Sequence, residues 1–177
     1  MRKCSNHRFL KGAIAGMIGG FAGSWAMNQF SSGVSTVQQA WKKTDRRSPS
    51  QNNSQSSNSD EAATTLLAER ISQAVLGRDL TDGEKKIAEP LVHYGFGAAV
   101  GSLYGVLAEL TPMARKGAGT AYATAVWLGG DELAVPKLQL SKSASQYSAG
   151  VHTEALASHL VYGLTTEGVR RGVRALL

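Results

Sequence analysis

Four stretches of the chain contain no Asp, Glu, Lys or Arg and are rich in Gly, Ala, Val, Ile and Leu. They cover residues 12–41, 91–108, 117–130 and 155–166. An 18-residue helix is about 27 Å long, close to the roughly 30 Å of hydrocarbon in a bilayer. The pattern therefore predicts an all-α fold, a four-helix transmembrane bundle. We expect its transmembrane helices at residues 12–30, 91–110, 117–135 and 151–169, the last two reaching this length only when charged residues are included.

The rest of the chain is polar and predicts connecting segments. Residues 1–11 and 170–177 form basic tails, and residues 31–90 form a long polar loop. Within that loop, residues 48–59 read SPSQNNSQSSNS, a low-complexity tract that cannot bury a core and is expected to be disordered. Residues 60–76 place apolar side chains at helical spacing and predict a short amphipathic helix.

The sequence also marks where helices begin and end. Thr81 is followed three residues later by Glu84, which predicts a capping box at the start of a second short helix over residues 82–88. We expect Gly77 to end the amphipathic helix before it. Pro90 is expected to separate the second short helix from the transmembrane helix that follows.

Small residues recur at every fourth position in each predicted transmembrane helix. Lipid gives apolar side chains little reason to associate, so helices pack closely where small residues let the backbones meet. The expected helix-packing residues are Gly12, Gly16, Gly20, Gly97, Gly101, Gly105, Gly117, Gly129 and Gly163. Whether all these stripes pack within one chain, or some join two copies into a homo-oligomer, stays open on the sequence alone.

Composition and charge narrow the class of protein. The chain has 177 residues, a formal net charge of +6 and a single cysteine, Cys4. One cysteine excludes a disulfide framework within the chain and a multi-cysteine zinc site. The basic residues flank apolar helices instead of lining one face of a soluble domain, so we expect the lipid bilayer as a partner and no nucleic acid.

Lys and Arg near the helix ends predict the orientation. Both tails and the segment 111–116 are basic, whereas the segment 136–150 holds only Lys137 and Lys142. Cytoplasmic loops of membrane proteins are enriched in Lys and Arg. We therefore expect both termini in the cytoplasm.

Ionisable residues in or near the predicted helices are the candidate functional groups. Such a side chain at the centre of a bilayer costs about 2.5–3.5 kcal/mol, so each calls for a reason. The candidate proton or ion cluster consists of His93, Asp131, Glu132, His152, Glu154, His159, Glu109 and Glu167. With antiparallel helices, the first five lie at one membrane face together with Asn28. His159 lies near the middle, and Glu109 and Glu167 lie at the other face.

Three interpretations of this cluster are open. Histidine changes charge near pH 6.5, so the cluster could sense or relay protons between about pH 5 and 7. His93, His152 and Asp131 could instead hold a divalent metal ion. Alternatively, the groups at helix ends are solvated in the interface, and His159 is a neutral residue hydrogen-bonded to a neighbouring helix.

Other functional classes find less support in the sequence. No Ser-His, Cys-His or HExxH constellation is present, so we expect neither an enzyme nor a cofactor. The glycines of residues 95–101 are spaced as in a dinucleotide-binding turn, but the buried strand and the acidic residue of that fold are lacking. The N-terminal residues also have the shape of a signal peptide. Because the other glycine-rich stretches repeat this pattern, we favour a transmembrane helix.

Three strings of residues resemble a known family. HYGFGAAVGSLYGVLAE at 93–109, TAVWLGGDELAVPKLQLS at 124–141 and HLVYGLTTEGVRR at 159–171 resemble the YagU-like family of small bacterial inner-membrane proteins. The resemblance implies a multi-pass protein of the bacterial inner membrane and implies no catalytic residue. The sequence therefore predicts a structural or accessory helix bundle, with an acid-responsive membrane protein that relays protons or ions as the alternative.

Overall fold

The computed structural model describes residues 2–44 and 55–177, and within these ranges it contains helices and turns but no strand. The long helices are α1 (Arg2–Thr44), α2 (Gln55–Leu76), α3 (Asp82–Leu110) and α6 (Ala149–Leu176). Between α3 and α6 lie η1 (Pro112–Gly119), α4 (Thr120–Trp127), the π-helix η2 (Leu128–Ala134), α5 (Val135–Lys137) and η3 (Ala144–Gln146). The prediction of an all-α fold is confirmed.

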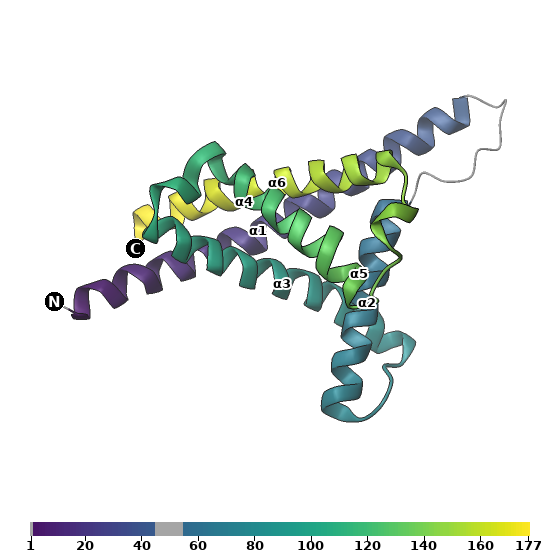
Figure 1. Ribbon diagram of the computed structural model, residues 1–177, viewed down its shortest axis with the longest axis horizontal. Helices are drawn as coiled ribbons and strands as arrows, with labels where there is room; N and C mark the ends of the chain where they lie inside the picture. The colour runs from purple at the N-terminus through teal and green to yellow at the C-terminus, as the bar shows by residue number, and fades with distance from the viewer. Residues whose placement is uncertain (1, 45–54) are drawn as a thin grey trace.

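The helices α1, α3 and α6 run along a common direction, with α1 in contact with both α3 and α6 (Figure 1). Both neighbours are antiparallel to α1, and α4 packs antiparallel to α6. The two ends of the chain and the η1 turn lie at one end of this bundle. At the other end, α2 crosses the bundle at a steep angle.

Glycine contacts join α1 to α3. The stripe Gly12, Gly16 and Gly20 of α1 faces the stripe Gly105, Gly101 and Gly97 of α3. A Cβ atom added to Gly12 would lie 2.8 Å from the Gly105 carbonyl oxygen, and one added to Gly20 would lie 2.8 Å from the Gly101 Cα atom. Any side chain would therefore force the two backbones apart, and these two stripes pack within one chain.

A second set of small residues lies against α6. A Cβ at Gly19 would meet the Thr166 carbonyl oxygen at 2.5 Å, and one at Gly163 would meet the Gly119 carbonyl oxygen at 2.6 Å. Gly163 thus packs against the start of α4.

Gly117 and Gly129 do not lie at helix contacts, in contrast to their expected role. Gly117 has a φ of +67° in η1, where the chain reverses after Pro112 and needs a left-handed conformation. Gly129 has no atom within 4 Å of an added Cβ in the described part of the chain. Gly129 belongs to the π-helix, which changes the four-residue spacing from which its position was predicted.

The helices extend further than the charge-free stretches. α1 continues through the expected basic tail and into the expected loop, ending at Thr44. α3 runs without interruption from Asp82, and Pro90 lies inside it instead of separating two helices. A proline in a helix removes one backbone hydrogen bond, which the rest of this long helix tolerates.

The first loop follows the predictions only in part. Thr81 and Glu84 form the expected capping box, and α2 ends at Leu76, before Gly77 with a φ of +69°. Of the tract predicted to be disordered, residues 48–54 lie outside the described residues. Residues 55–59 are helical, because they form the first turns of α2.

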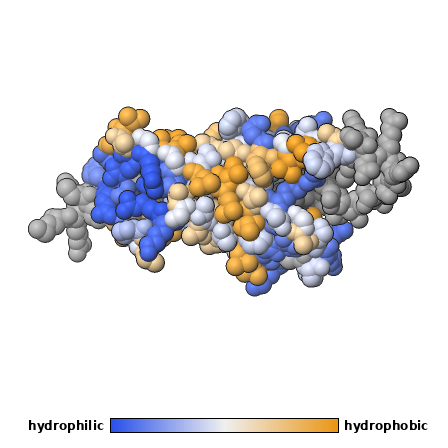
Figure 2. All heavy atoms as spheres, turned by 90° about the horizontal axis from the view of Figure 1, so that it is seen from above, coloured by the Kyte–Doolittle hydropathy of each residue, from blue (hydrophilic) through white to orange (hydrophobic). Residues whose placement is uncertain are grey.

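Large apolar side chains lie mostly on the outside of the bundle, and many buried side chains are small or polar. Phe21, Trp25 and Leu103 are each 55–56% exposed. The buried polar and charged residues include Ser24, Ser158, His159, Thr166, Glu167 and Arg170. Figure 2 shows hydrophobic side chains around the middle of the long axis and a hydrophilic patch at the end that holds the termini.

Among the described helices, only α3 is both long and apolar enough to cross a membrane by length and composition. Its most apolar 18-residue window has a mean hydropathy of 1.3, and 28% of that window is buried. One such helix is weak evidence for a membrane protein, because the core helix of a soluble protein can pass the same test. The low buried share separates α3 from a typical core helix.

Candidate functional site

The π-helix η2 presents two consecutive carboxylates to α6. Its backbone widens so that the Val135 N–H donates to the Gly130 carbonyl, five residues back. Pro136 follows directly and has no N–H to donate, which disfavours regular helix at this point. The π-turn carries Asp131 and Glu132, and π-turns often occur at functional sites.

Two histidine–carboxylate pairs join η2 to α6. His152 Nδ1 lies 2.6 Å from Glu132 Oε1. His159 Nε2 lies 3.6 Å from Asp131 Oδ2, which is longer than a normal hydrogen bond. The His159 side chain is 10% exposed and the Asp131 side chain 30% exposed. The sequence placed all four residues in one cluster, and the structure resolves them into two separate pairs.

The hydrogen bond on the far side of His159 fixes which nitrogen carries its proton. Its Nδ1 lies 2.9 Å from the Ala155 carbonyl oxygen, and a carbonyl can only accept, so Nδ1–H is the donor. Nε2 then carries a second proton only when the imidazole is positively charged. A proton shared between His159 and Asp131 is therefore one that the pair gains or loses as pH changes.

The other residues predicted to share a membrane face with Asp131, Glu132 and His152 lie around these pairs. Glu154 Oε2 accepts a long 3.5 Å hydrogen bond from the side-chain amide of Gln38 (Nε2) on α1. Asn28 donates to the Tyr94 hydroxyl at 3.3 Å, beside His93 on α3. These contacts place Glu154, Asn28 and His93 toward the same end of the bundle.

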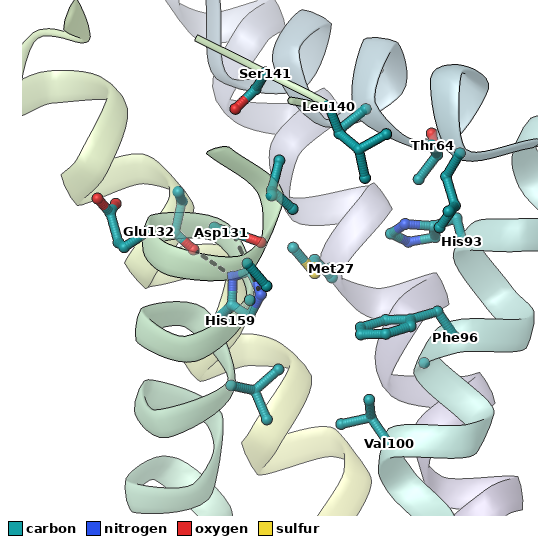
Figure 3. Close-up of a pocket in the computed structure, with 18 of the residues that line it drawn as sticks. Met27, Thr64, His93, Phe96, Val100, Asp131, Glu132, Leu140, Ser141 and His159 are labelled. Carbon is teal, nitrogen blue, oxygen red and sulfur yellow. Dashed lines mark hydrogen bonds and ion pairs between the residues drawn. The ribbon is translucent and has the colours of Figure 1, made fainter. Parts of the chain in front are cut away.

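A cavity of about 240 Å³ lies between α1, α2, α3, η2 and α6. Asp131 and His159 lie on one side of it, and His93 and Phe96 lie on the other, with Met27 between them (Figure 3). Most of the other lining side chains are apolar. The candidate residues thus surround a cavity, which the sequence did not predict.

Glu167 and Glu109 form a second, separate site near the chain termini. Glu167 is 1% exposed and accepts hydrogen bonds from Tyr104 Oη at 3.0 Å and from Arg170 Nε at 2.6 Å. Arg171 Nε also donates to Glu167, at 2.6 Å. These partners neutralise the buried carboxylate, so this site has the geometry of a structural ion-pair network.

Glu109 is held by two arginines from different helices. Arg8 Nε of α1 donates at 3.0 Å, and Arg174 Nε of α6 donates at 2.8 Å. The sequence placed Glu109 and Glu167 at the same face but did not predict their arginine partners. The i, i+3 and i, i+4 spacing of Glu167 to Arg170 and Arg171 is a signal that could have identified two of them.

The expected metal triad is not assembled. His93, His152 and Asp131 all line the cavity, but no group of three or more His, Cys, Asp or Glu in the described ranges could hold a metal ion. The carboxylates are already directed at histidines, with Glu132 on His152 and Asp131 nearest His159. The structure therefore gives no support to the metal interpretation.

An exposed ion pair lies outside the bundle, at the junction of α2 and α3. Arg78 donates two hydrogen bonds to Glu84, at 2.6 and 2.9 Å, and Glu84 also accepts from the Thr81 backbone N–H at 2.8 Å. The Arg78 hydrogen bond, followed by those of Thr81, holds the pKa of Glu84 well below its usual range. This pair secures the helix start and has no contact with the cavity.

Comparison with known proteins adds no family to these observations. No protein-family model, no curated protein and no solved structure matches this chain.

Proposed function

We propose that this chain is a multi-pass protein of the bacterial inner membrane, with both termini in the cytoplasm, and that it acts as a structural or accessory helix bundle. Its four membrane-crossing segments would lie in α1, α3, the continuous α4–η2–α5 segment and α6. We also propose membership of the YagU-like family, which rests on the three strings noted above.

The observation that carries this proposal is that large apolar side chains lie on the outside of the helix bundle while small residues lie at its helix contacts. Exposed apolar side chains such as Phe21, Leu103 and Leu164 would cost free energy in water, at roughly 25 cal/mol per Å². In lipid the same side chains need no cover. The close glycine contacts between α1 and α3 are the packing that lipid-embedded helices use.

The modest hydropathy of α1 and α6 has a chemical explanation. Their charge-free stretches contain Gly, Ser, Thr, Asn and Gln, which lower the mean hydropathy. Many of these residues face neighbouring helices in the bundle, as Gly16 does, or are buried, as Ser158 and Thr166 are. A helix whose polar residues face its neighbours can cross a bilayer with a lower mean hydropathy than a lone helix.

Reporter fusions test the number of membrane crossings and the orientation together. A periplasm-active reporter fused after Ser54 or after Ser145 is expected to be active, and one fused to the C-terminus is expected to be inactive. A soluble or single-pass protein would give a different pattern at Ser145 or at the C-terminus. Extraction at alkaline pH provides the control, because an integral protein stays in the membrane fraction.

A second candidate function, an acid-responsive membrane protein, is favoured by the two histidine–carboxylate pairs. His159 faces Asp131 of η2, and His93 of α3 lies across the cavity. His152 faces Glu132 of η2 and the ring of Tyr147. Protonation of each histidine would turn its contact into an ion pair, so acidification would tighten η2 against α6.

Proton flux into liposomes after a pH step tests this second function. We expect His152→Ala and His159→Ala to reduce the flux or shift its pH dependence. His7→Ala is the matched control, because His7 is exposed at the opposite end of α1. Equal flux in all three variants and the unaltered protein would refute the acid response while leaving the membrane bundle intact.

A further inference from the structure

The cavity between η2 and α3 combines apolar walls with buried polar atoms that lack a hydrogen-bond partner in the described part of the chain, and His159 Nε2 lies 3.6 Å from one of them, Asp131 Oδ2. Asp131 Oδ2 and His93 Nε2 are both buried, and neither has a hydrogen-bond partner among the described residues. A buried polar atom without a hydrogen-bond partner destabilises the fold, because it has lost its hydrogen bonds to water. Two such atoms around one cavity point to a bound molecule that satisfies them.

The charge of the lining selects the kind of molecule. Two carboxylates, Asp131 and Glu132, line the cavity together with three histidines, and none of its described lining residues is Lys or Arg. With the histidines neutral, the cavity carries net negative charge. An anion would be repelled, whereas a cation would lower the energy of the Asp131 carboxylate.

The hydrogen-bonding capacity of the unpartnered atoms also favours a cation. A carboxylate oxygen accepts only, and a neutral imidazole nitrogen without a proton also accepts. An ammonium group offers three donors and accepts none.

Size and wall chemistry define the rest of the molecule. A volume of about 240 Å³ equals that of about eight water molecules at roughly 30 Å³ each. Met27, Val100 and Leu140 contribute apolar surface. A short hydrocarbon chain fits this surface better than a cluster of water molecules.

We propose that this cavity binds a small lipophilic organic cation, with its ammonium group at Asp131 and its hydrocarbon part against Met27, Phe96 and Val100. This inference goes beyond the proposed membrane function. It depends on neither the number of membrane crossings nor the acid response, because the cavity is formed within the folded chain.

Three probes of equal chain length separate charge from hydrophobicity. The full chain, purified in detergent, is titrated at pH 7.5 with hexylammonium, 1-hexanol and hexanoate, and binding is followed by calorimetry. A charge-assisted hydrogen bond contributes about 1.5–3 kcal/mol, so hexylammonium should bind at least about tenfold more tightly than hexanol. Hexanoate should bind more weakly than both.

Two variants locate the site. Asp131→Asn should remove the preference for hexylammonium over hexanol. Glu154→Gln is the matched control, since Glu154 lies on α6 outside the cavity lining, and it should leave the preference unchanged. If Asp131→Asn does not fold, Val100→Phe, which fills part of the cavity, should weaken binding of hexylammonium and hexanol alike.

The outcomes that would overturn the proposal are equally specific. Equal affinity for hexylammonium and hexanol would show that the carboxylate does not recognise the cation. A preference that survives in Asp131→Asn, or is lost in Glu154→Gln, would place the cation elsewhere. Unchanged binding in Val100→Phe would exclude the cavity.

Discussion

The contact between α1 and α3 leads to a prediction about one methyl group. Gly101→Ala adds a Cβ that would lie 2.5 Å from the Gly20 Cα atom, whereas ordinary van der Waals contact begins at 3.4 Å. The two backbones must therefore separate by about 0.9 Å, and gaps of this size forfeit a quarter to a half of each neighbouring dispersion contact. We expect a loss of about 1–3 kcal/mol in the free energy of unfolding.

Gly95→Ala is the matched control for this change. Gly95 lies in the same helix, and an added Cβ there would meet no described atom within 4 Å. Both substitutions gain the same intrinsic helix propensity, up to about 1 kcal/mol, so their difference isolates the helix contact. The assay is unfolding in mixed micelles with increasing dodecyl sulfate, followed by circular dichroism. Equal midpoints for the two variants would refute the close packing of α1 on α3.

Further predictions concern the buried ion pair, the helix junction and the η1 turn. Glu167→Gln leaves the buried Arg170 without its carboxylate and should lower the free energy of unfolding by about 3–5 kcal/mol; a wild-type midpoint would contradict the network. The depressed pKa of Glu84 means that its ion pair with Arg78 stabilises the fold at pH above about 4.3 and loses this effect as pH falls toward the folded-state pKa. The protection factors of the amides at the start of α3, measured against the intrinsic exchange rate at each pH, should therefore fall on acidification, and Glu84→Gln should abolish that dependence; an unaltered pH dependence of protection in the variant would count against it. Ala118→Gly should raise the thermal midpoint, because Ala118 has a φ of +52° that costs a non-glycine residue about 1–2 kcal/mol; a lower midpoint would contradict this.

Much of the helical framework could be predicted from charge and small-residue spacing. Long charge-free stretches identify α3 and the central part of α1, because the absence of charged residues can be read from the sequence without knowing which segments are in contact. The stripes of α1 and α3 share the same spacing, which predicts close helix packing but left open whether the two stripes meet within one chain. The extent of α1 could not be predicted, since its ends are polar and become helical without an apolar pattern.

The site was predictable in membership but not in geometry. Spacing placed Asp131, Glu132 and His152 at one end and His159 nearer the middle, because antiparallel helices bring such positions together. It could not reveal the π-turn, which changes the helical repeat and decides which carboxylate faces which histidine. The cavity is lined by side chains from elements far apart in the chain, so no local sequence pattern predicts it.

The central claim is that four helical segments of this chain lie in lipid. The most direct measurement is the quenching of single-tryptophan fluorescence by brominated lipids. Variants with one tryptophan each would keep Trp25 or carry Leu103→Trp, Leu128→Trp or Leu164→Trp, with the remaining native tryptophans replaced by phenylalanine. All four positions are 50–56% exposed, and one lies in each proposed membrane-crossing segment. In liposomes with bromine on the acyl chains, the account predicts strong fluorescence quenching at all four positions. Quenching at Leu103→Trp alone would indicate a single membrane crossing, and quenching at none would contradict the membrane bundle.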